Sequence, residues 1–68
     1  MILEKLTRKI QVGDVCCGHD GSLRLEVVEV KTHEDGRMRV VVYNTNRGTK
    51  STWDSLDPDG FFYVLVQS

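Results

Sequence analysis

The chain has 68 residues, of which 40% are hydrophobic and 28% are charged, and nine Lys or Arg against ten Asp or Glu give a formal net charge of -1. A chain of this length buries only about 60% of the surface that its unfolded form exposes, so it has little room for an enclosed substrate cavity beside its core. The near-neutral charge excludes a histone-like polycation, and no apolar run reaches the roughly 20 residues of a membrane-spanning helix.

The first ten residues allow two interpretations. Leu3, Leu6 and Ile10 stand at helical spacing, yet a stretch this short is marginal as an isolated helix in water. The sequence therefore predicts a single domain in which segment 1–10 forms either one or two helical turns or an extended arm packed across residues 11–66.

From Val12 onward the apolar residues recur with a period of two, and Gly, Asn or Asp interrupts them at short intervals. This pattern predicts an all-β domain. A first short strand is expected over 11–18, entered through a turn at Gly13-Asp14. A polar loop follows it over 18–22.

Two local signals organise the middle of the chain. The second strand is expected over 23–31, and its alternation changes phase at Val27-Val28, which predicts a β-bulge that bends the strand. Asp35-Gly36 then stands between two alternating runs and favours a tight hairpin whose glycine takes a positive φ. The third strand, 37–44, is therefore expected to pair with the second. Its core face is expected to consist of Met38, Val40 and Val42. Its outer face is expected to consist of Arg37, Arg39, Val41 and Tyr43.

The last part of the chain predicts two more strands. Residues 44–48 are rich in types that tolerate the left-handed region and form a turn before a short fourth strand over 49–53. Cap-like side chains over 54–57 surround one leucine and are cut off by Pro58, which predicts a 3₁₀ turn before the last strand. The last strand, 61–66, is apolar on both faces and is expected to be central or covered on both sides.

An outward-facing apolar strip is a candidate contact surface. It is expected to form from Val41, Phe61, Tyr63 and Leu65. If the N-terminal segment leaves the strip open, the last strand can form a homo-oligomer or receive a partner by strand addition. The alternative is that Leu3, Leu6 and Ile10 cover the strip within the chain.

Five short strands, a bulged second strand, a Gly-Asp turn before the first strand and a 3₁₀ turn before the last together resemble the SH3-like barrel, over about residues 12–66. Val12-Gly13-Asp14-Val15, with the later Gly48, Trp53 and Leu56, is similar to the pattern of KOW-type and Tudor-like domains. The resemblance implies a five-stranded SH3-like barrel with a short N-terminal arm or helical turn. The short chain also resembles small phage or mobile-element proteins in style.

The two cysteines, Cys16 and Cys17, are adjacent, and a disulfide between them would close a strained ring. Their number and spacing favour a reducing compartment, so a cytoplasmic location is expected. With His19 and His33 they could supply four zinc ligands, but neighbouring strand residues point to opposite faces. We therefore expect one buried and one exposed thiol and no metal. Cys-His catalysis also requires a pocket and an oxyanion site, so no catalytic residue and no cofactor is predicted.

The most suggestive feature for function is a stretch between Gly36 and Trp53 that contains four basic residues and no acid. Basic side chains interleaved with aromatic ones suit an acidic protein partner, or phosphate contacts combined with base stacking. The predicted contact face consists of Arg37, Arg39, Tyr43, Arg47, Lys50 and Trp53.

The same residues can also form a plain solvated face, with Trp53 turned into the core. The net charge of -1 disfavours non-specific nucleic-acid binding. The sequence thus predicts a non-enzymatic binding or adaptor module with a protein partner and no membrane partner. Nucleic-acid binding by the same face is the alternative, and a thiol enzyme or a metal-binding domain is a remote one.

Overall fold

The computed structural model describes residues 1–18 and 21–66. Within them lie six strands and one 3₁₀ turn: β1 (Ile2–Leu6), η1 (Thr7–Lys9), β2 (Val15–Cys16), β3 (Leu25–Thr32), β4 (Met38–Asn44), β5 (Thr49–Leu56) and β6 (Phe61–Leu65). All neighbouring strands are antiparallel, in one sheet of order β1-β6-β2-β3-β4-β5. The all-β prediction is confirmed. The prediction of five strands is wrong because the N-terminal segment supplies a sixth.

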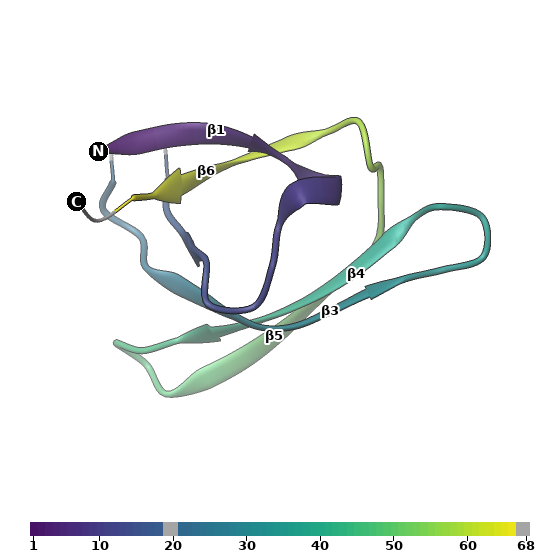
Figure 1. Ribbon diagram of the computed structural model, residues 1–68. Coiled ribbons are helices and arrows are strands. Elements are labelled where there is room, and N and C mark those ends of the chain that lie inside the picture. Colours follow the sequence, from purple (N-terminus) through teal and green to yellow (C-terminus); the bar gives the residue numbers. More distant parts are fainter. Residues whose placement is uncertain (19–20, 67–68) are drawn as a thin grey trace.

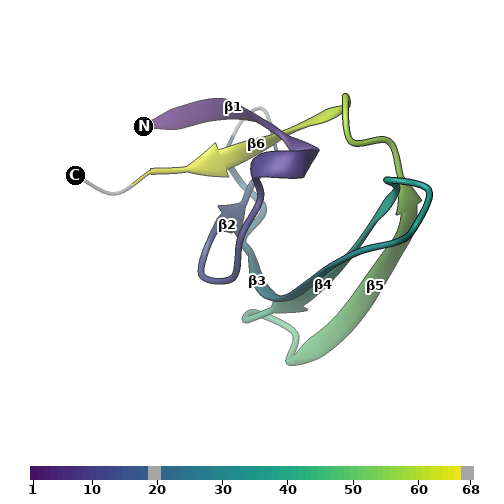
Figure 2. The same ribbon diagram turned by 45° about the vertical axis from the view of Figure 1, so that its right-hand side comes forward.

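The sheet curls until its two halves face each other, so that β1 and β6 lie over the layer formed by β3, β4 and β5 (Figures 1 and 2). Among the described strands no hydrogen-bonded ladder joins β5 to β1, so the sheet is open rather than a closed barrel. The core fills the space between the layers. It consists of Ile10, Cys16, Val27, Val40, Val42 and Val64, with Leu25, Val30, Trp53, Leu56 and Phe62 packed against it.

The N-terminal segment is an integral strand over Ile2–Leu6 followed by a single 3₁₀ turn over Thr7–Lys9, so it is not an arm, and only its end is helical. β1 pairs with β6 along its whole length, from Ile2 opposite Leu65 to Leu6 opposite Phe61. Thr7 is buried beyond the end of β1, and its N–H donates to the carbonyl of Gly60 at 2.9 Å. Pairing with β6 satisfies the backbone of a segment too short to be stable as an isolated helix.

The predicted first strand is much shorter than expected. Only Val15–Cys16 is a strand, because residues 11–14 form a turn in which Asp14 N–H donates to the Gln11 carbonyl at 3.1 Å. The Asp14 carboxylate accepts from Gln11 N–H at 3.0 Å, and Gly13 takes a φ of 99°. The predicted Gly13-Asp14 turn is therefore confirmed. Of the polar loop predicted over 18–22, His19 and Asp20 lie outside the described residues.

The predicted bulge and hairpin are both present. The register between β3 and β4 shifts between Val27 and Glu29, which leaves Val28 without a partner in the ladder. Val27 is fully buried, whereas Val28 is exposed. In the following loop Gly36 has a φ of 89°, and His33 N–H donates to the Arg37 carbonyl at 2.8 Å.

Replacing Gly36 with Val is expected to lower the free energy of unfolding by about 1–3 kcal/mol, because a β-branched residue is strained at positive φ. A Cβ atom at this position would meet nothing within 4 Å, so the loss measures backbone strain alone. Urea denaturation followed by circular dichroism measures it. Gly36→Asn is the control and should lose less, because Asn tolerates positive φ. Equal losses for both variants would contradict this interpretation of the turn.

β5 is longer than predicted and replaces the expected 3₁₀ turn. It continues to Leu56, which pairs with Met38, and the register shifts between Met38 and Val40. The shift places both Asp54 and Ser55 opposite Arg39 of β4. Ser55 takes a φ of 55°. This bulge lets the strand continue past residue 53, so the 3₁₀ prediction over 54–57 is wrong. A turn follows instead, with Gly60 N–H donating to the Asp57 carbonyl at 3.0 Å.

β6 is central, as predicted, with β1 on one side and β2 on the other. Strand addition to the last strand is therefore not available, since the free edges of the described sheet are β1 and β5. Leu6 lies beside Phe61 in the sheet rather than over it. Phe61 remains 53% exposed and contacts Tyr63 edge-on, with ring centroids 5.8 Å apart.

Candidate binding surface

The predicted contact residues are divided between two faces of the sheet. Tyr43 pairs with Lys50 across the β4–β5 ladder, and Arg39 shares the outer face of β4 with Tyr43 because side chains alternate along a strand. Arg47 lies exposed in the adjoining β4–β5 turn. Trp53 is opposite Val40, a core residue, and therefore faces inward. Arg39, Tyr43 and Lys50 are thus brought to one side, Arg47 lies in the turn that joins their strands, and Trp53 faces the other way.

The indole of Trp53 belongs to the core. It stacks on the ring of Phe62 with the centroids 5.3 Å apart and the planes 11° apart. Both rings pack against the buried cluster. Trp53 is therefore turned into the core and does not belong to the contact face.

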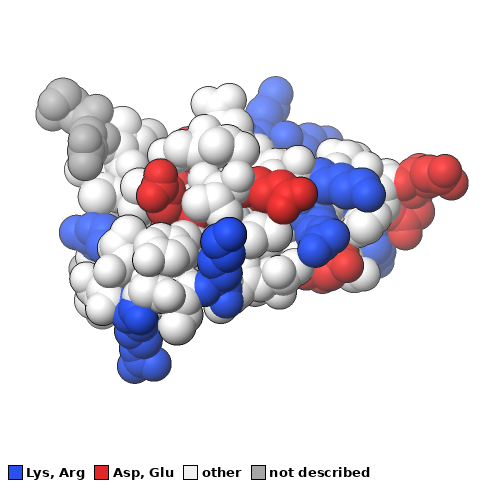
Figure 3. Space-filling model, turned by 90° about the horizontal axis from the view of Figure 1, so that it is seen from below, with Lys and Arg blue, Asp and Glu red and all other residues white. Residues whose placement is uncertain are grey.

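The outer face also carries acids that the sequence did not place there. β3 sets Glu26 opposite Tyr43 and Glu29 opposite Val41. Figure 3, which views the layer of β3, β4 and β5 from outside, shows blue Lys and Arg side chains interspersed with red Asp and Glu. The basic stretch of the sequence thus becomes a surface of mixed charge, because β3 supplies Glu26 and Glu29 as well as Lys31, which lies opposite Arg39.

We call this region the outer surface and define it by Glu26, Glu29, Arg39, Val41, Tyr43, Lys50 and Thr52. Val41 lies at its centre and is only 8% exposed although it faces outward. Tyr43 is half-buried. Arg39 and Lys50 form no ion pair with any described residue, and the buried Nε of Arg39 has no hydrogen-bond partner among those residues. Lys50 is exposed, whereas Arg39 is partly buried and lies opposite Asp54, whose carboxylate it stabilises electrostatically.

A shallow hollow borders the outer surface at Glu26. It has a volume of about 210 Å³ and is lined by Val15, Arg24, Glu26, Thr45 and Leu65. Its lining combines two aliphatic side chains with one charge of each sign. Such a hollow can hold a single side chain of a partner.

A larger hollow of about 490 Å³ lies where β1 and β6 approach the turn before β2. Lys5 and Asp14 are at its wall, and their side chains form an ion pair at 2.8 Å. Asp14 also accepts the Gln11 N–H. This carboxylate is therefore engaged in holding the turn, and the other acid of the lining is the exposed Glu4.

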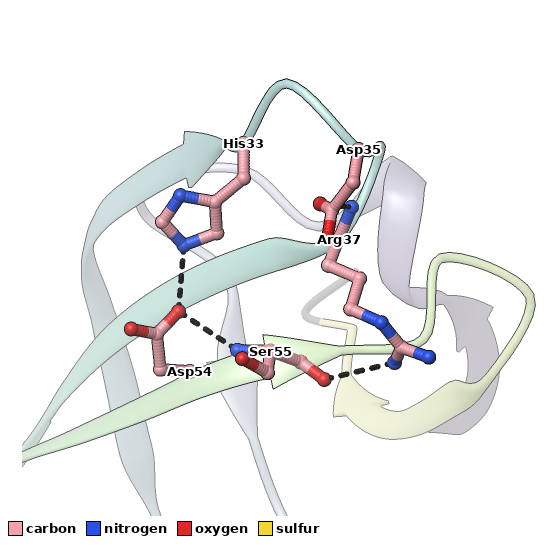
Figure 4. A network of polar contacts seen from close by, with 5 residues as sticks. All are labelled: His33, Asp35, Arg37, Asp54 and Ser55. Carbon is pink, nitrogen blue, oxygen red and sulfur yellow. Dashed lines mark hydrogen bonds and ion pairs between the residues drawn. The ribbon is translucent and has the colours of Figure 1, made fainter.

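Arg37 takes part in a polar network at the end of the β3–β4 hairpin (Figure 4). His33 Nε2 lies 2.6 Å from Asp54 Oδ1, and Ser55 N–H donates to the same oxygen at 2.7 Å. The Arg37 guanidinium donates to the Ser55 carbonyl at 3.1 Å, while Asp35 accepts the Arg37 N–H at 3.0 Å. These contacts join the hairpin loop to the bulge of β5, so Arg37 has a role within the fold.

The His33–Asp54 pair resembles part of a catalytic triad only in composition. The pKa of Asp54 lies below its usual range. The main cause is the hydrogen bond between its carboxylate and His33, and the second is the hydrogen bond from the Ser55 N–H. Asp54 is 53% exposed, and neither of the two hollows is lined by His33 or Asp54. An exposed pair without a substrate cavity is better suited to fastening two loops than to acid-base chemistry.

No family model, curated protein or solved structure matches the chain. In the described part of the chain no group of three or more His, Cys, Asp or Glu is placed to hold a metal ion. None of its helical segments has the length and apolar character needed to cross a membrane.

The thiols differ from the expectation of one buried and one exposed side chain. Cys16 and Cys17 are both free and both buried, at 4% and 6% exposure. β2 ends at Cys16, so the alternation of faces no longer applies to Cys17, whose N–H donates to the Tyr63 carbonyl at 2.9 Å. Burial raises the pKa of Cys16 to about 11. At neutral pH Cys16 is therefore a protonated thiol and a poor nucleophile.

Replacing Ser55 with Gly is expected to raise the free energy of unfolding by about 0.5–1 kcal/mol, because a left-handed residue with a Cβ is strained. Only the backbone N–H and carbonyl of Ser55 take part in the network, so Gly keeps these contacts. Ser55→Ala is the matched control, since it removes the hydroxyl but retains the strain. Urea denaturation should show a higher free energy of unfolding for Ser55→Gly and no increase for Ser55→Ala. The opposite order would contradict the interpretation that Ser55 is strained.

Proposed function

We propose that this chain is a small non-enzymatic module that binds another protein through its outer surface. The observation that carries the proposal is the position of Tyr43, half-buried beside Lys50 and Glu26, with the unpaired guanidinium of Arg39 on the same face of β4. Tyr and Arg are enriched in protein interfaces, and charges of both signs give such an interface its register. The hollow beside Glu26 adds a place for one apolar side chain.

The same features favour a protein over nucleic acid. Phosphate binding needs several cations that neutralise the backbone. Glu26 and Glu29 lie among the cations of the outer surface and would repel phosphates. Carboxylates of an acidic protein segment can instead pair with Arg39 and Lys50, while its cations meet the two glutamates.

Two further features of the sequence belong to this proposal. The bulge in β3 and the Gly13-Asp14 turn support an SH3-like architecture, from which the sixth strand and the open edge depart. The free cysteines support a reducing compartment such as the cytoplasm.

The test compares capture of a protein partner from extracts of the native host by wild type, Arg39→Glu and Tyr43→Ala. Either substitution should reduce the recovered partner about tenfold or more, as expected for central interface residues. Arg8→Glu is the matched control, because Arg8 lies in η1 and its exposed side chain forms an ion pair with Asp59. Equal capture by all four proteins would contradict the proposed surface.

A second arm tests the nucleic-acid alternative. Fluorescence anisotropy with single- and double-stranded DNA and RNA at low salt should show no saturable binding by wild type. If wild type bound nucleic acid, if this binding weakened steeply as salt rises, and if Arg39→Glu abolished it, the outer surface would be a nucleic-acid-binding surface and not a protein-binding one.

A further inference from the structure

The free edge of β5 is the feature that the proposed function does not use. β5 has eight residues and pairs only with β4, whereas β1, the other edge strand, has five. Figures 1 and 2 show no strand beyond β5. An edge strand exposes a row of unpaired N–H and C=O groups, which is a template for pairing with another strand.

The sequence of β5 is complementary to itself when two copies run antiparallel about a two-fold axis through Thr52. In this register Thr52 lies opposite Thr52 of the second copy, and Lys50 lies opposite Asp54. Directly opposite residues share a face of the joint sheet. Lys50, Thr52 and Asp54 all lie on the outer face, so two Lys–Asp pairs would flank a central Thr–Thr pair.

The backbone satisfies the same register. In an antiparallel pair alternate residues direct their N–H and C=O groups to one side of the strand. In this register residues 50, 52 and 54 meet only each other, and residues 51 and 53 meet only each other. The backbone groups that point to the free edge belong either to residues 50, 52 and 54 or to residues 51 and 53. In both cases they lie opposite the same residues of the second copy and can form hydrogen bonds with them.

Other registers lose the charge pairs. An axis through Ser51 places Lys50 opposite Thr52, and an axis through Trp53 places Asp54 opposite Thr52, so no Lys meets an Asp in either. Along β1 an axis through Glu4 would set Glu4 opposite itself, which is unfavourable. The charges thus favour β5 over β1 and one register over its neighbours.

The contacts around Asp54 leave this arrangement possible. Its Oδ1 accepts from His33 and Ser55, so Oδ2 is available to Lys50 of a second copy. Lys50 forms no ion pair with a described residue. The bulge formed by Asp54 and Ser55 ends regular backbone pairing at Trp53, so the Lys50–Asp54 contact would be one between side chains.

From this complementarity we propose that two copies of the chain associate through their β5 edges, antiparallel and centred on Thr52, and so join two six-stranded sheets into one. A contact of one strand from each copy is small, so the dimer is weak, with a Kd of about 10 µM to 1 mM. The outer surface continues across the joint and presents two binding sites side by side. Association is measured on the pure protein, so its test does not depend on the protein partner proposed above, although both contacts use Lys50.

The test uses the residue that lies opposite itself. Sedimentation equilibrium of wild type should show a monomer–dimer equilibrium below about 1 mM. Thr52→Glu and Thr52→Lys should each be monomeric, because each places like charges at the axis. Mixed in equal amounts, the two variants should form a heterodimer. Asn46→Glu, in the exposed β4–β5 turn, is the control and should associate like wild type.

Several outcomes would overturn the proposal. These are a wild type that is monomeric throughout, Thr52 variants that still form homodimers, and a mixture that stays monomeric although both variants show the circular dichroism of wild type. If a Thr52 variant does not fold, Lys50→Glu takes its place. This substitution should weaken the dimer about tenfold or more, because attraction becomes repulsion at two positions. An unchanged dimer in Lys50→Glu would overturn the proposal as well.

Discussion

Replacing Val40 with Asp is expected to leave the chain unfolded at neutral pH. Val40 is completely buried, with Val30 opposite it on β3 and Trp53 opposite it on β5. A carboxylate there would lose its hydration without gaining a partner. Native domains have about 0.05–0.15 kcal/mol of stability per residue, or about 3–10 kcal/mol for this chain of 68 residues. An unpaired buried charge costs about 4 kcal/mol or more, which is comparable with the whole stability.

Loss of the far-UV circular dichroism and collapse of the amide proton dispersion in NMR spectra would show the unfolding. A gentler pair of variants tests the register itself. Val40→Thr buries a hydroxyl without a partner and should cost about 1–3 kcal/mol, whereas Val41→Thr places the hydroxyl on the outer face and should cost less. The reverse order would mean that the faces of β4 are exchanged, as a slip by one residue would cause.

Features that depend on neighbouring residues could be predicted from the sequence. The Asp35-Gly36 hairpin, the phase change at Val27 and the core face of β4 all follow from local alternation and from the conformational freedom of glycine. The turn at Gly13-Asp14 belongs to the same class. In each case the residues that carry the signal are also those that form the element.

Features that depend on distant pairing could not be predicted in this way. Glu26 and Glu29 reach the outer surface because β3 is the neighbour of β4, and no local pattern places them beside Tyr43. The bulge at Asp54 and Ser55 has no glycine to mark it, because Ser55 adopts the positive φ. The extra strand β1 likewise forms only because the edge of β6 is there to receive it.

Trp53 illustrates the same difficulty on the candidate site. The strand that contains it is mostly polar, so alternation does not show which of its faces is buried. Its proximity in sequence to the basic residues suggested a contact face, whereas pairing with Val40 turns the indole inward. Of the predicted contact residues, Arg39 and Tyr43 follow from alternation along β4, whereas the face of Lys50 depends on its pairing with Tyr43.

Replacing Trp53 with Ala is expected to lower the free energy of unfolding by about 2–4 kcal/mol, because a large half-buried aromatic ring is removed from the core. Its stack on Phe62 joins β5 to β6. Among the described strands no ladder connects these two, so the stacked rings provide a side-chain contact between β5 and β6 across the open side of the sheet. Urea denaturation followed by far-UV circular dichroism measures the loss without relying on tryptophan fluorescence.

Trp53→Phe is the matched control, because it keeps a flat ring in contact with Phe62 and should retain at least half of the stability that Ala loses. The pair of variants also separates a core role from a binding role. If Trp53→Ala were as stable as wild type and yet lost the protein partner, the indole would have to contact that partner, contrary to its stacked position on Phe62. A graded loss of stability, with partner binding retained wherever the variant is folded, assigns Trp53 to the core and leaves recognition to Arg39, Tyr43 and Lys50.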